Sequence, residues 1–422
     1  MLNTSRLTAM LLALALAFEG FVFAQGTSRQ RVRVVNANQY PGADIGAKIN
    51  AADRALGSAP GEITVSGGGT ISTQVIISSD HTLRLLPGTY VTRTTAPPIL
   101  LKPRSSVIGS GWNSIITEST APRQFTVIIA FNHSVRNGDA DSGLLIRDLQ
   151  IRGANSGFDS AQQAISLGNC SGCTVERVWI NGTRSIGIAL GGSSYLGNLA
   201  ENSKVINCLF TRVASQNLAV VNGRNILFEG NKFLASGQRG GPGSTNIDLE
   251  PNESTDHIEN VTVRNNLIDV RESEVPTTGN GIVVQSGSGT HFVGPILVEN
   301  NTIIGGTNQG TVTTILSNGV YLIGVTMRDV TVRNNVIRRT GQAGVNLDGC
   351  SHVTIVDNQM TDVGGGGIPG FIVNNVSDSR IEGNTFTYSG SGSVDARIVV
   401  SGASRRNIYR NNRGFTVTGN TQ

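Results

Sequence analysis

The segment 246-NIDLEPN-252 carries two carboxylic acids two positions apart, in a chain in which only 15% of residues are charged. Its apolar and polar residues alternate, which predicts a β-strand with one buried face. Residues i and i+2 of a strand lie on the same side, roughly 6.5–7 Å apart. Asp248 and Glu250 are therefore candidate catalytic residues, one a general acid and the other a base, at the lower end of the separation that an inverting glycosidase requires.

Two ordinary explanations of the acidic pair compete with catalysis. The acids could belong to a solvated strand face, or they could bind turn amides near 251-PN-252. A catalytic role requires partial burial and mutual repulsion, which would raise the pKa of one carboxyl group so that it keeps its proton. The residues alone leave these alternatives open.

The elements that must position the pair are repeated along the chain. One phrase consists of an apolar residue, polar residues, an Asn that is often doubled, and a second apolar residue. Copies stand at 205-VINCLF-210, 227-LFEGNKF-233, 263-VRNNLI-268, 298-VENNTI-303, 332-VRNNVI-337, 355-IVDNQM-360 and 381-IEGNTF-386, with weaker ones at 146-IRDLQI-151 and 175-VERVWI-180. The intervals of 23 to 35 residues suit a coil whose strands are fixed while its loops vary.

A second phrase, a short alternating strand, follows each copy of the first. Examples are 164-AISLG-168, 187-GIALG-191, 218-LAVVN-222, 246-NIDLE-250, 281-GIVVQ-285, 319-GVYLI-323 and 344-GVNLD-348. Strands repeated without helical patterns between them predict a parallel β-solenoid whose coils stack about 4.8 Å apart over one core. The Asn residues at 266, 301, 335, 358 and 384 are expected to form a hydrogen-bonded ladder.

The open end of such a solenoid needs a cap, because its edge strands carry unpaired backbone groups. In 42-GADIGAKINAADRALG-57 the apolar residues at 45, 49, 52 and 56 fall on one face of a predicted helix. Gly57 is a suitable C-terminal stop for that helix. The first coils follow, among them 83-LRLLPGTYV-91.

The segment GADIGAKINAA, the strand after it and LLPGTYV are similar to the N-terminal part of the pectate-lyase-like superfamily of right-handed parallel β-helix proteins. The later coils resemble the β-helix repeat of that superfamily, so the resemblance runs from about residue 34 to residue 410. It implies an all-β fold, a right-handed parallel β-helix (solenoid) with a short N-terminal capping helix. It also implies a substrate cleft along the sheet formed by the second-phrase strands.

Side chains at one strand position of a parallel β-helix form a column from coil to coil. The column beside Asp248 reads Ser166, Ala189, Ala219, Asp248, Val283, Tyr321 and Asn346, and the column beside Glu250 reads Gly168, Gly191, Val221, Glu250, Gln285, Ile323 and Asp348. Small residues next to polar and aromatic ones favour a groove for an extended glycan. The substrate-binding candidates are Asn246, Gln285, Tyr321, Asn346 and Asp348, with Arg239 and Arg224 as partners for a uronate carboxylate.

Composition and the N-terminus bound the domain organisation. A basic start, an apolar run and small residues before Gln25 predict a signal peptide over 1–24, with cleavage near Ala24 and a secreted or periplasmic chain. The N-terminal segment and capping helix are expected over 25–61, a single β-helix domain over 62–412 and a tail over 413–422. No later segment has the ~20 apolar residues of a membrane span.

The net charge of +4 comes without Lys/Arg clusters, so no nucleic-acid partner is expected. We expect a monomer.

The spacing of the four cysteines does not indicate a catalytic or metal-binding role. Cys170 and Cys173 have zinc-ribbon spacing without a second pair, so no metal site is predicted. An exported protein could oxidise this pair, and Cys208 and Cys350 have no evident partners. Buried small apolar residues are the simplest interpretation of all four.

The expected function is the cleavage or modification of a polysaccharide, pectin-like or otherwise uronate-containing. A glycoside hydrolase that uses Asp248 and Glu250 is one hypothesis, and a β-helix lyase with an arginine base is another. A non-catalytic glycan-binding surface protein and a purely structural protein are the others. No cofactor is expected, except Ca²⁺ in the lyase case. The chain departs from the motifs of polygalacturonases, of which only 246-NID-248 echoes one, and it lacks an acidic calcium cluster.

Overall fold

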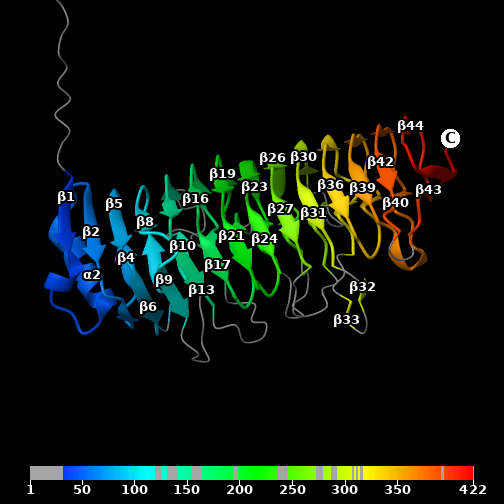
Figure 1. The fold of residues 1–422 in the computed structure, drawn as a ribbon. Helices are drawn as coiled ribbons and strands as arrows, with labels where there is room; N and C mark the ends of the chain where they lie inside the picture. Colours follow the sequence, from blue (N-terminus) through cyan, green and yellow to red (C-terminus); the bar gives the residue numbers. More distant parts are fainter. Residues whose placement is uncertain are drawn as a thin grey trace, which may run out of the picture. The chain divides into compact units, whose positions relative to one another are not determined.

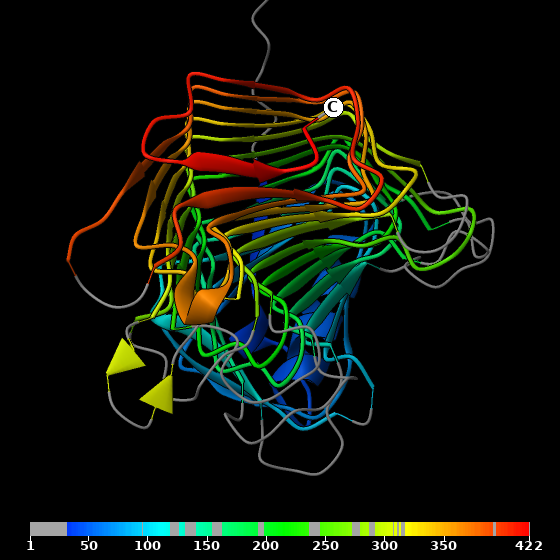
Figure 2. The same cartoon turned by 90° about the vertical axis from the view of Figure 1, so that its right-hand side faces the viewer.

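The computed structural model describes residues 32–94, 96–118, 126–130, 141–153, 163–192, 198–235, 245–271, 279–286, 292–306, 308–309, 312–313, 317–390 and 394–421. In the unit Val34–Gln422, three parallel sheets wind around one core, with a helix at the N-terminal end (Figure 1). The view along the stack shows the strands of successive coils lying over one another (Figure 2). The predicted all-β parallel β-helix with an N-terminal capping helix is therefore confirmed.

The sheets are named A, B and C here. Sheet A contains β1 (Arg33–Asn36), β2 (Gly61–Val65), β5 (His81–Leu85), β8 (Ser106–Gly109), β11 (Asp141–Ser142), β12 (Leu145–Arg147), β15 (Cys170–Ser171), β16 (Thr174–Glu176), β19 (Ala200–Glu201), β20 (Lys204–Ile206), β23 (Gly223–Glu229), β26 (His257–Arg264), β29 (Phe292–Val293), β30 (Ile296–Glu299), β35 (Val330–Arg333), β38 (Thr354–Val356), β41 (Arg380–Glu382) and β44 (Ile408–Arg410). Sheet B contains β3 (Gly69–Ile71), β6 (Gly88–Thr92), β9 (Ser114–Glu118), β13 (Gln150–Arg152), β17 (Trp179–Asn181), β21 (Leu209–Thr211), β24 (Lys232–Leu234), β27 (Leu267–Asp269), β31 (Thr302–Ile304), β36 (Val336–Arg338), β39 (Gln359–Thr361) and β42 (Thr385–Thr387).

Sheet C is built from the second-phrase strands and their neighbours. It contains β4 (Val75–Ile77), β7 (Ile99–Leu101), β10 (Ile128–Ala130), β14 (Ile165–Leu167), β18 (Ile188–Leu190), β22 (Leu218–Val220), β25 (Ile247–Leu249), β28 (Ile282–Gln285), β34 (Val320–Ile323), β37 (Val345–Asp348), β40 (Phe371–Asn374), β43 (Arg397–Ser401) and β45 (Thr416–Gly419). The remaining elements are the antiparallel pair β32 (Asn308–Gln309) and β33 (Val312–Thr313), the helix α2 (Ile45–Leu56), and the 3₁₀ turns η1 (Ala37–Gln39) and η3 (Gly365–Gly367).

A ladder of buried Asn amides joins the coils at the corner between sheets A and B. Asn301 shows the pattern, because its Nδ2 donates to Asn335 Oδ1 at 3.0 Å and to Val263 O at 2.9 Å. Its Oδ1 accepts from the backbone N and the Nδ2 of Asn266, each at 3.0 Å. The ladder runs through Asn231, Asn266, Asn301, Asn335, Asn358, Asn384 and Asn412. The five predicted positions are confirmed, and the ladder extends one residue further at each end.

The doubled Asn of the repeat has two separate physical causes. The first Asn of each pair turns the corner in the left-handed region, with φ of 56° at Asn265 and 55° at both Asn300 and Asn334. Asn tolerates this conformation better than other residues with a side chain, apart from Asp, because its short amide can bond locally. The second Asn is the buried member of the ladder. The first Asn therefore forms the turn, and the second links its coil to the adjacent coils by hydrogen bonds.

Helix α2 caps the N-terminal end as predicted. Asp44 accepts hydrogen bonds from Gly46 N and Ala47 N at 2.7 and 3.2 Å, which satisfies the first turn of the helix. The helix ends at Gly57, whose φ is 74°. Its apolar stripe is buried at Ile49 and at the positions 52 and 56.

The same helix satisfies backbone groups of the edge strand that it covers. Asn50 Oδ1 accepts from Ile76 N at 3.0 Å, and Asp53 Oδ1 accepts from Ser78 N at 3.1 Å. An uncovered parallel edge would leave such amides free to pair with another chain. The cap therefore closes the core and also removes the donors of the open edge.

The structure differs from the expected boundaries at the C-terminus. Strand β45 lies within the segment expected as a tail over 413–422, and it pairs with β43 in register. The β-helix therefore continues past residue 412 through most of that segment. The expected signal peptide over 1–24 lies outside the described residues.

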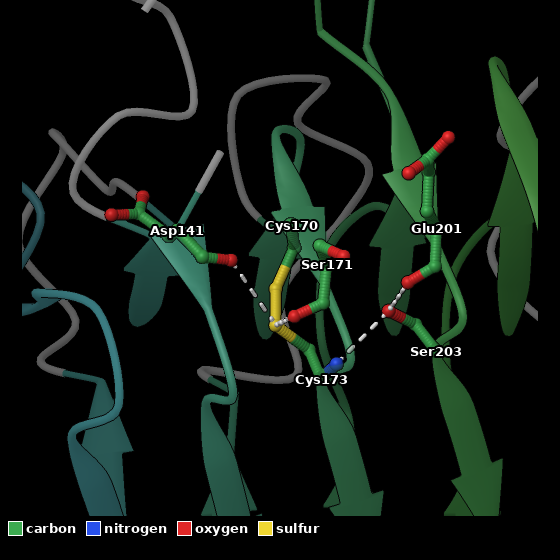
Figure 3. Close-up of a disulfide and its surroundings, with 6 residues drawn as sticks. All are labelled: Asp141, Cys170, Ser171, Cys173, Glu201 and Ser203. Carbon is green, nitrogen blue, oxygen red and sulfur yellow. Dashed lines mark hydrogen bonds between the residues drawn. A yellow bond between two sulfur atoms is a disulfide. The ribbon is translucent and has the colours of Figure 1, made fainter. Parts of the chain in front are cut away.

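Cys170 and Cys173 form a disulfide within one coil (Figure 3), so the two residues are not the free apolar fillers that we expected. Both are buried, and Ser203 Oγ of the next coil accepts a hydrogen bond from Cys173 N at 3.1 Å. Cys208 and Cys350 do fit the expectation, since they are buried and free. Burial raises the pKa of both thiols to about 12, which makes them unreactive.

The ladder gives a prediction about stability. Replacing Asn335 with Ala removes the partner of two donors on Asn301 and leaves the Asn358 Oδ1 acceptor with one donor fewer. Unsatisfied buried groups cost about 1–3 kcal/mol each, so we expect Asn335→Ala to lower the free energy of unfolding by about 2–4 kcal/mol. Urea unfolding followed by circular dichroism measures this change.

The control for that experiment is the neighbouring turn residue. Asn334→Gly keeps a residue that accepts the left-handed conformation, so its effect should be a few tenths of a kcal/mol. Equal stability of Asn335→Ala and the parent protein would show that the ladder does not support the fold.

Candidate active site on sheet C

The register of sheet C places the predicted column beside Asp248 as expected. Directly paired residues run Ser166, Ala189, Ala219, Asp248, Val283, Tyr321 and Asn346. In the second column, Gln285, Ile323 and Asp348 are also paired from coil to coil. Glu250 directly follows β25. Its backbone N donates to Val220 O at 2.9 Å, so the hydrogen bonding between the coils extends to this residue. The alternating pattern thus predicted the side-chain columns correctly.

Asp248 is a buried acid with a neutral partner. Its residue is 4% exposed, and its Oδ2 accepts a hydrogen bond from Gln216 Nε2 of the preceding coil at 3.2 Å. Its Oδ1 is also buried and accepts no hydrogen bond from any residue that the structure describes. Glu250 is half-buried beside it. An ionised Asp248 would therefore be poorly solvated by its surroundings.

These surroundings raise the pKa of Asp248 to about 8. The largest cause is burial, which disfavours the charged form, and repulsion from Glu250 adds to it. A side-chain interaction with Glu250 that favours the protonated acid acts in the same direction, whereas the hydrogen bond from Gln216 opposes the shift. Asp248 thus holds a proton near neutral pH, which is the state of a general acid.

The acids of sheet A lie in a contrasting environment. Glu229, Arg264, Glu299 and Arg333 stack in register, with ion pairs of 3.0 Å between the first two and 2.7 Å between the last two. The Arg264 guanidinium lowers the pKa of Glu229. No such cation faces Asp248 among the described residues, so burial and the acidic neighbour raise its pKa instead.

The ordinary explanations of the acidic pair do not describe Asp248. A solvated strand face is excluded by its burial. In the turn after the strand, the amides Asn252 N and Glu253 N donate to Asp256 Oδ2 at 3.1 and 2.8 Å. The residue that binds the turn is therefore Asp256, and the buried carboxyl group of Asp248 is not used there.

Asn246 has a structural position, which corrects its assignment to substrate binding. Its residue is 1% exposed, its Oδ1 accepts from Asn217 Nδ2 at 3.0 Å, and its Nδ2 donates to Asn280 O at 3.2 Å. Asn318 Nδ2 continues the series by donating to Asn280 Oδ1 at 2.9 Å. These residues form a second Asn series at the start of the sheet C strands. An amide held in this way joins coils and does not reach a ligand on the outer face.

Four of the predicted substrate-binding residues lie together on the outer face of sheet C. Gln285, Tyr321, Asn346 and Asp348 are half-buried in adjacent coils. Burial and the nearby charge of Asp348 raise the pKa of Tyr321, which places these two side chains close to each other. Asp348 Oδ1 also accepts from Asn374 Nδ2 of the next coil at 2.9 Å. The structure therefore brings these residues into one surface with Glu250.

The N-terminal half of the predicted groove is not open surface. The small outward residues Ser166, Ala189 and Ala219 are 7–8% exposed, and Val283 is 6% exposed. Small side chains in this column predicted a groove. In the structure these side chains are instead closely packed and almost inaccessible to solvent. In the second column, the described residues are half-buried from Val221 onward, through Glu250 and Gln285 toward the C-terminus.

Of the two arginines assigned to a uronate carboxylate, Arg224 does not join this surface. Arg224 lies on β23 of sheet A, where its guanidinium contacts Glu201 of the preceding coil. Arg239 lies outside the described residues. The arginine hypothesis therefore remains a prediction for Arg239, and the contacts of Arg224 are those of a surface ion pair.

Gln216 is a site residue that the sequence pattern did not bring to attention. It stands two residues before β22, outside the alternating strand motif 218-LAVVN-222 that defines the columns. The signal that could have found it is the polar residue preceding each Asn of the second series, as in 216-QN-217 and 245-TN-246. Alignment of those residues places Gln216 one coil from Asp248.

The described residues contain no group of three or more His, Cys, Asp or Glu side chains that could hold a metal ion. They also contain no helix of the length and apolar character needed to cross a membrane.

Comparisons with known proteins agree with the observed architecture. Residues 137–315 and 318–421 match the family described as "Right handed beta helix region". None of the curated proteins matches the chain in sequence.

Several solved structures share the fold. A hyperthermoactive exopolygalacturonase from Thermotoga maritima has a TM-score of 0.58 at 12% identity, covering 85% of this chain and 90% of that one. A family 28 exopolygalacturonase from Yersinia enterocolitica has a TM-score of 0.50 at 11% identity, covering 93% and 78%. A tailspike protein mutant of E. coli bacteriophage HK620, in complex with a pentasaccharide, has a TM-score of 0.53 at 16% identity, covering 86% and 68%. Likeness at such low identity shows the fold alone.

The raised pKa of Asp248 gives a prediction about pH-dependent stability. Between about pH 4 and the folded-state pKa of about 8, the folded chain holds a proton that the unfolded chain has released. The free energy of unfolding therefore falls as pH rises through this window, by up to about 1.4 kcal/mol per pH unit. Asp248→Asn lacks this contribution, so urea unfolding at several pH values should show the parent protein losing stability relative to the variant.

Glu253→Gln, at an exposed position of the following turn, is the matched control and should keep the pH dependence of the parent protein. Parallel curves for the parent protein and Asp248→Asn would contradict a raised pKa at Asp248.

Proposed function

The chain belongs to the right-handed β-helix family, and we propose that it is a polysaccharide-acting enzyme in which Asp248 and Glu250 catalyse glycoside hydrolysis. The observation that carries the proposal is the burial of Asp248, held by Gln216 next to the half-buried Glu250, in surroundings that raise its pKa to about 8. Two carboxyl groups whose environments separate their protonation states are the requirement for paired acid and base catalysis.

The two residues would take different roles in this reaction. Asp248 donates its proton to the glycosidic oxygen as the bond from the anomeric carbon to that oxygen breaks. Glu250 accepts a proton from the water molecule that attacks the anomeric carbon, so the bond broken is replaced by a bond to water. Gln216 holds Asp248 Oδ2 and fixes the orientation of the acid.

The positions of the two carboxyl groups set a condition on this mechanism. Residues i and i+2 are roughly 6.5–7 Å apart along a strand, but Glu250 is close enough to Asp248 to raise the pKa of its carboxyl group. A sugar and a water molecule fit between them only when Glu250 turns away from Asp248. Its partial exposure allows that rotation, whereas Asp248 is enclosed.

The neighbouring surface supports a polysaccharide as the substrate. Tyr321 offers an aromatic face for a sugar ring, and Gln285 and Asn346 offer amide groups for its hydroxyls in the same run of coils. The exopolygalacturonases and the tailspike–pentasaccharide complex with the same fold support this class of ligand, without indicating which sugar or linkage is used.

The proposal predicts how activity responds to change at the pair. Asp248→Asn and Glu250→Gln should each lower kcat by about 10²–10⁴-fold, because each removes a proton-transfer group. The activity of the parent protein should fall as pH rises through about 8, where Asp248 loses its proton. A panel of neutral and acidic polysaccharides, with and without Ca²⁺, and an assay for new reducing ends measure both effects.

Glu253→Gln is the control and should keep full activity. Unsaturated uronate absorbance in place of simple hydrolysis would assign the chain to the lyases. Glycan binding by the parent protein without turnover of any polysaccharide would overturn the enzymatic proposal and favour a glycan-binding protein.

A further inference from the structure

A hollow lies at the corner between sheets A and B, on a different part of the coil from Asp248. It has a volume of about 760 Å³, within the range of small-molecule sites. Its lining includes Trp112, Arg177, Leu209, Gly230, Lys232 and Leu234. With Asp148, the lining residues come from five successive coils, so the hollow extends along the stack.

Trp112 presents a large apolar surface that the fold does not bury. Its residue is 43% exposed, although its Nε1 donates to Arg177 O at 3.1 Å. Its ring packs against Trp179 with centroids 5.5 Å apart, and Trp179 Nε1 in turn donates to Thr211 Oγ1 at 2.8 Å. The indole of Trp112 is therefore held in position before any ligand arrives, which lowers the entropic cost of binding.

The glycine of this corner contributes to its shape. Gly230 has a φ of 67°, and an added Cβ would lie 2.4 Å from Asn207 Oδ1. A larger residue here would force Asn207 to move, and both residues line the hollow. A residue with a side chain at position 230 would therefore change the lining of the hollow.

The charges around the hollow leave one cation without an ionic partner. Asp148 accepts from Arg177 Nε and Nη2 at 2.6 and 3.0 Å, so these two lining charges neutralise each other. Lys232 is exposed on β24 and forms no ion pair with any residue that the structure describes. The hollow therefore combines a fixed aromatic face with a free ammonium group.

We propose that this hollow is a second glycan-binding site, which takes a sugar ring bearing a carboxylate. The apolar face of the ring stacks on the Trp112 indole, and the carboxylate meets the Lys232 ammonium group. An exposed indole suits the flat C–H face of a sugar, and the lysine adds preference for an acidic one. The site uses neither Asp248 nor Glu250, so it would anchor an acidic polysaccharide independently of the reaction on sheet C.

The composition of the chain makes the test direct. The sequence contains two Trp residues, and both lie at this corner, so Trp fluorescence reports on this site alone. Titration of the Asp248→Asn chain with oligogalacturonate should change the Trp emission, because the probe covers Trp112 and is not cleaved. Trp112→Ala should weaken binding by at least about tenfold in calorimetry.

Lys232→Met tests the preference for charge on a surface residue whose loss leaves the fold intact. It should weaken oligogalacturonate binding by up to about fivefold, and it should leave binding of a neutral cello-oligosaccharide unchanged. Lys204→Met, at another exposed lysine outside the hollow, is the matched control and should bind like its parent.

Three results would overturn the proposal. They are an absence of any emission change at millimolar oligogalacturonate, unchanged affinity in a folded Trp112→Ala variant, and equal binding of acidic and neutral oligosaccharides. An absence of catalysis in the parent protein would not affect this site, so its failure and that of the hydrolase proposal are distinguishable.

Discussion

Hydrogen bonding between buried amides of successive coils is the constraint on which the rest of this structure depends. Each ladder Asn exchanges bonds with the coil before it and the coil after it, so a coil cannot slip without breaking several buried bonds at once. The turn residue before it holds the left-handed conformation that starts each corner. Loops of different length can therefore interrupt the coils while the strands keep their register.

The fixed register places residues at the same strand position of successive coils next to each other in space. On sheet A it places acids beside arginines, so that Glu229 and Glu299 are paired with cations. On sheet C the same stacking places Ala219 and Val283 on either side of Asp248, and neither offers a charge. The raised pKa of Asp248 is thus a consequence of which residues occupy the adjacent coils. Gln216 supplies the one hydrogen bond to its Oδ2 from the described part of the chain.

Much of the fold was predictable because its signals are local and repeated. The Asn spacing predicted the ladder, the alternation of 246-NIDLE-250 predicted the side-chain column, and the apolar stripe of 42–57 predicted the cap. The partners of Asp248 and the ladder role of Asn246 depend on contacts between coils, which the pattern within one strand does not contain. The segment from residue 416 onward carries no copy of either repeated phrase, so the sequence did not predict the last strand. The lining of the Trp112 hollow comes from five coils, so no single sequence motif could indicate it.

The protonation state of Asp248 is the most direct test of the account. An infrared difference spectrum between the parent protein and Asp248→Asn at neutral pH isolates the carboxyl group at this position. The account predicts the C=O stretch of a protonated carboxylic acid, which is replaced by carboxylate bands as pH rises through about 8. Carboxylate bands alone at neutral pH would contradict the buried acid and, with it, the proposed division of roles between Asp248 and Glu250.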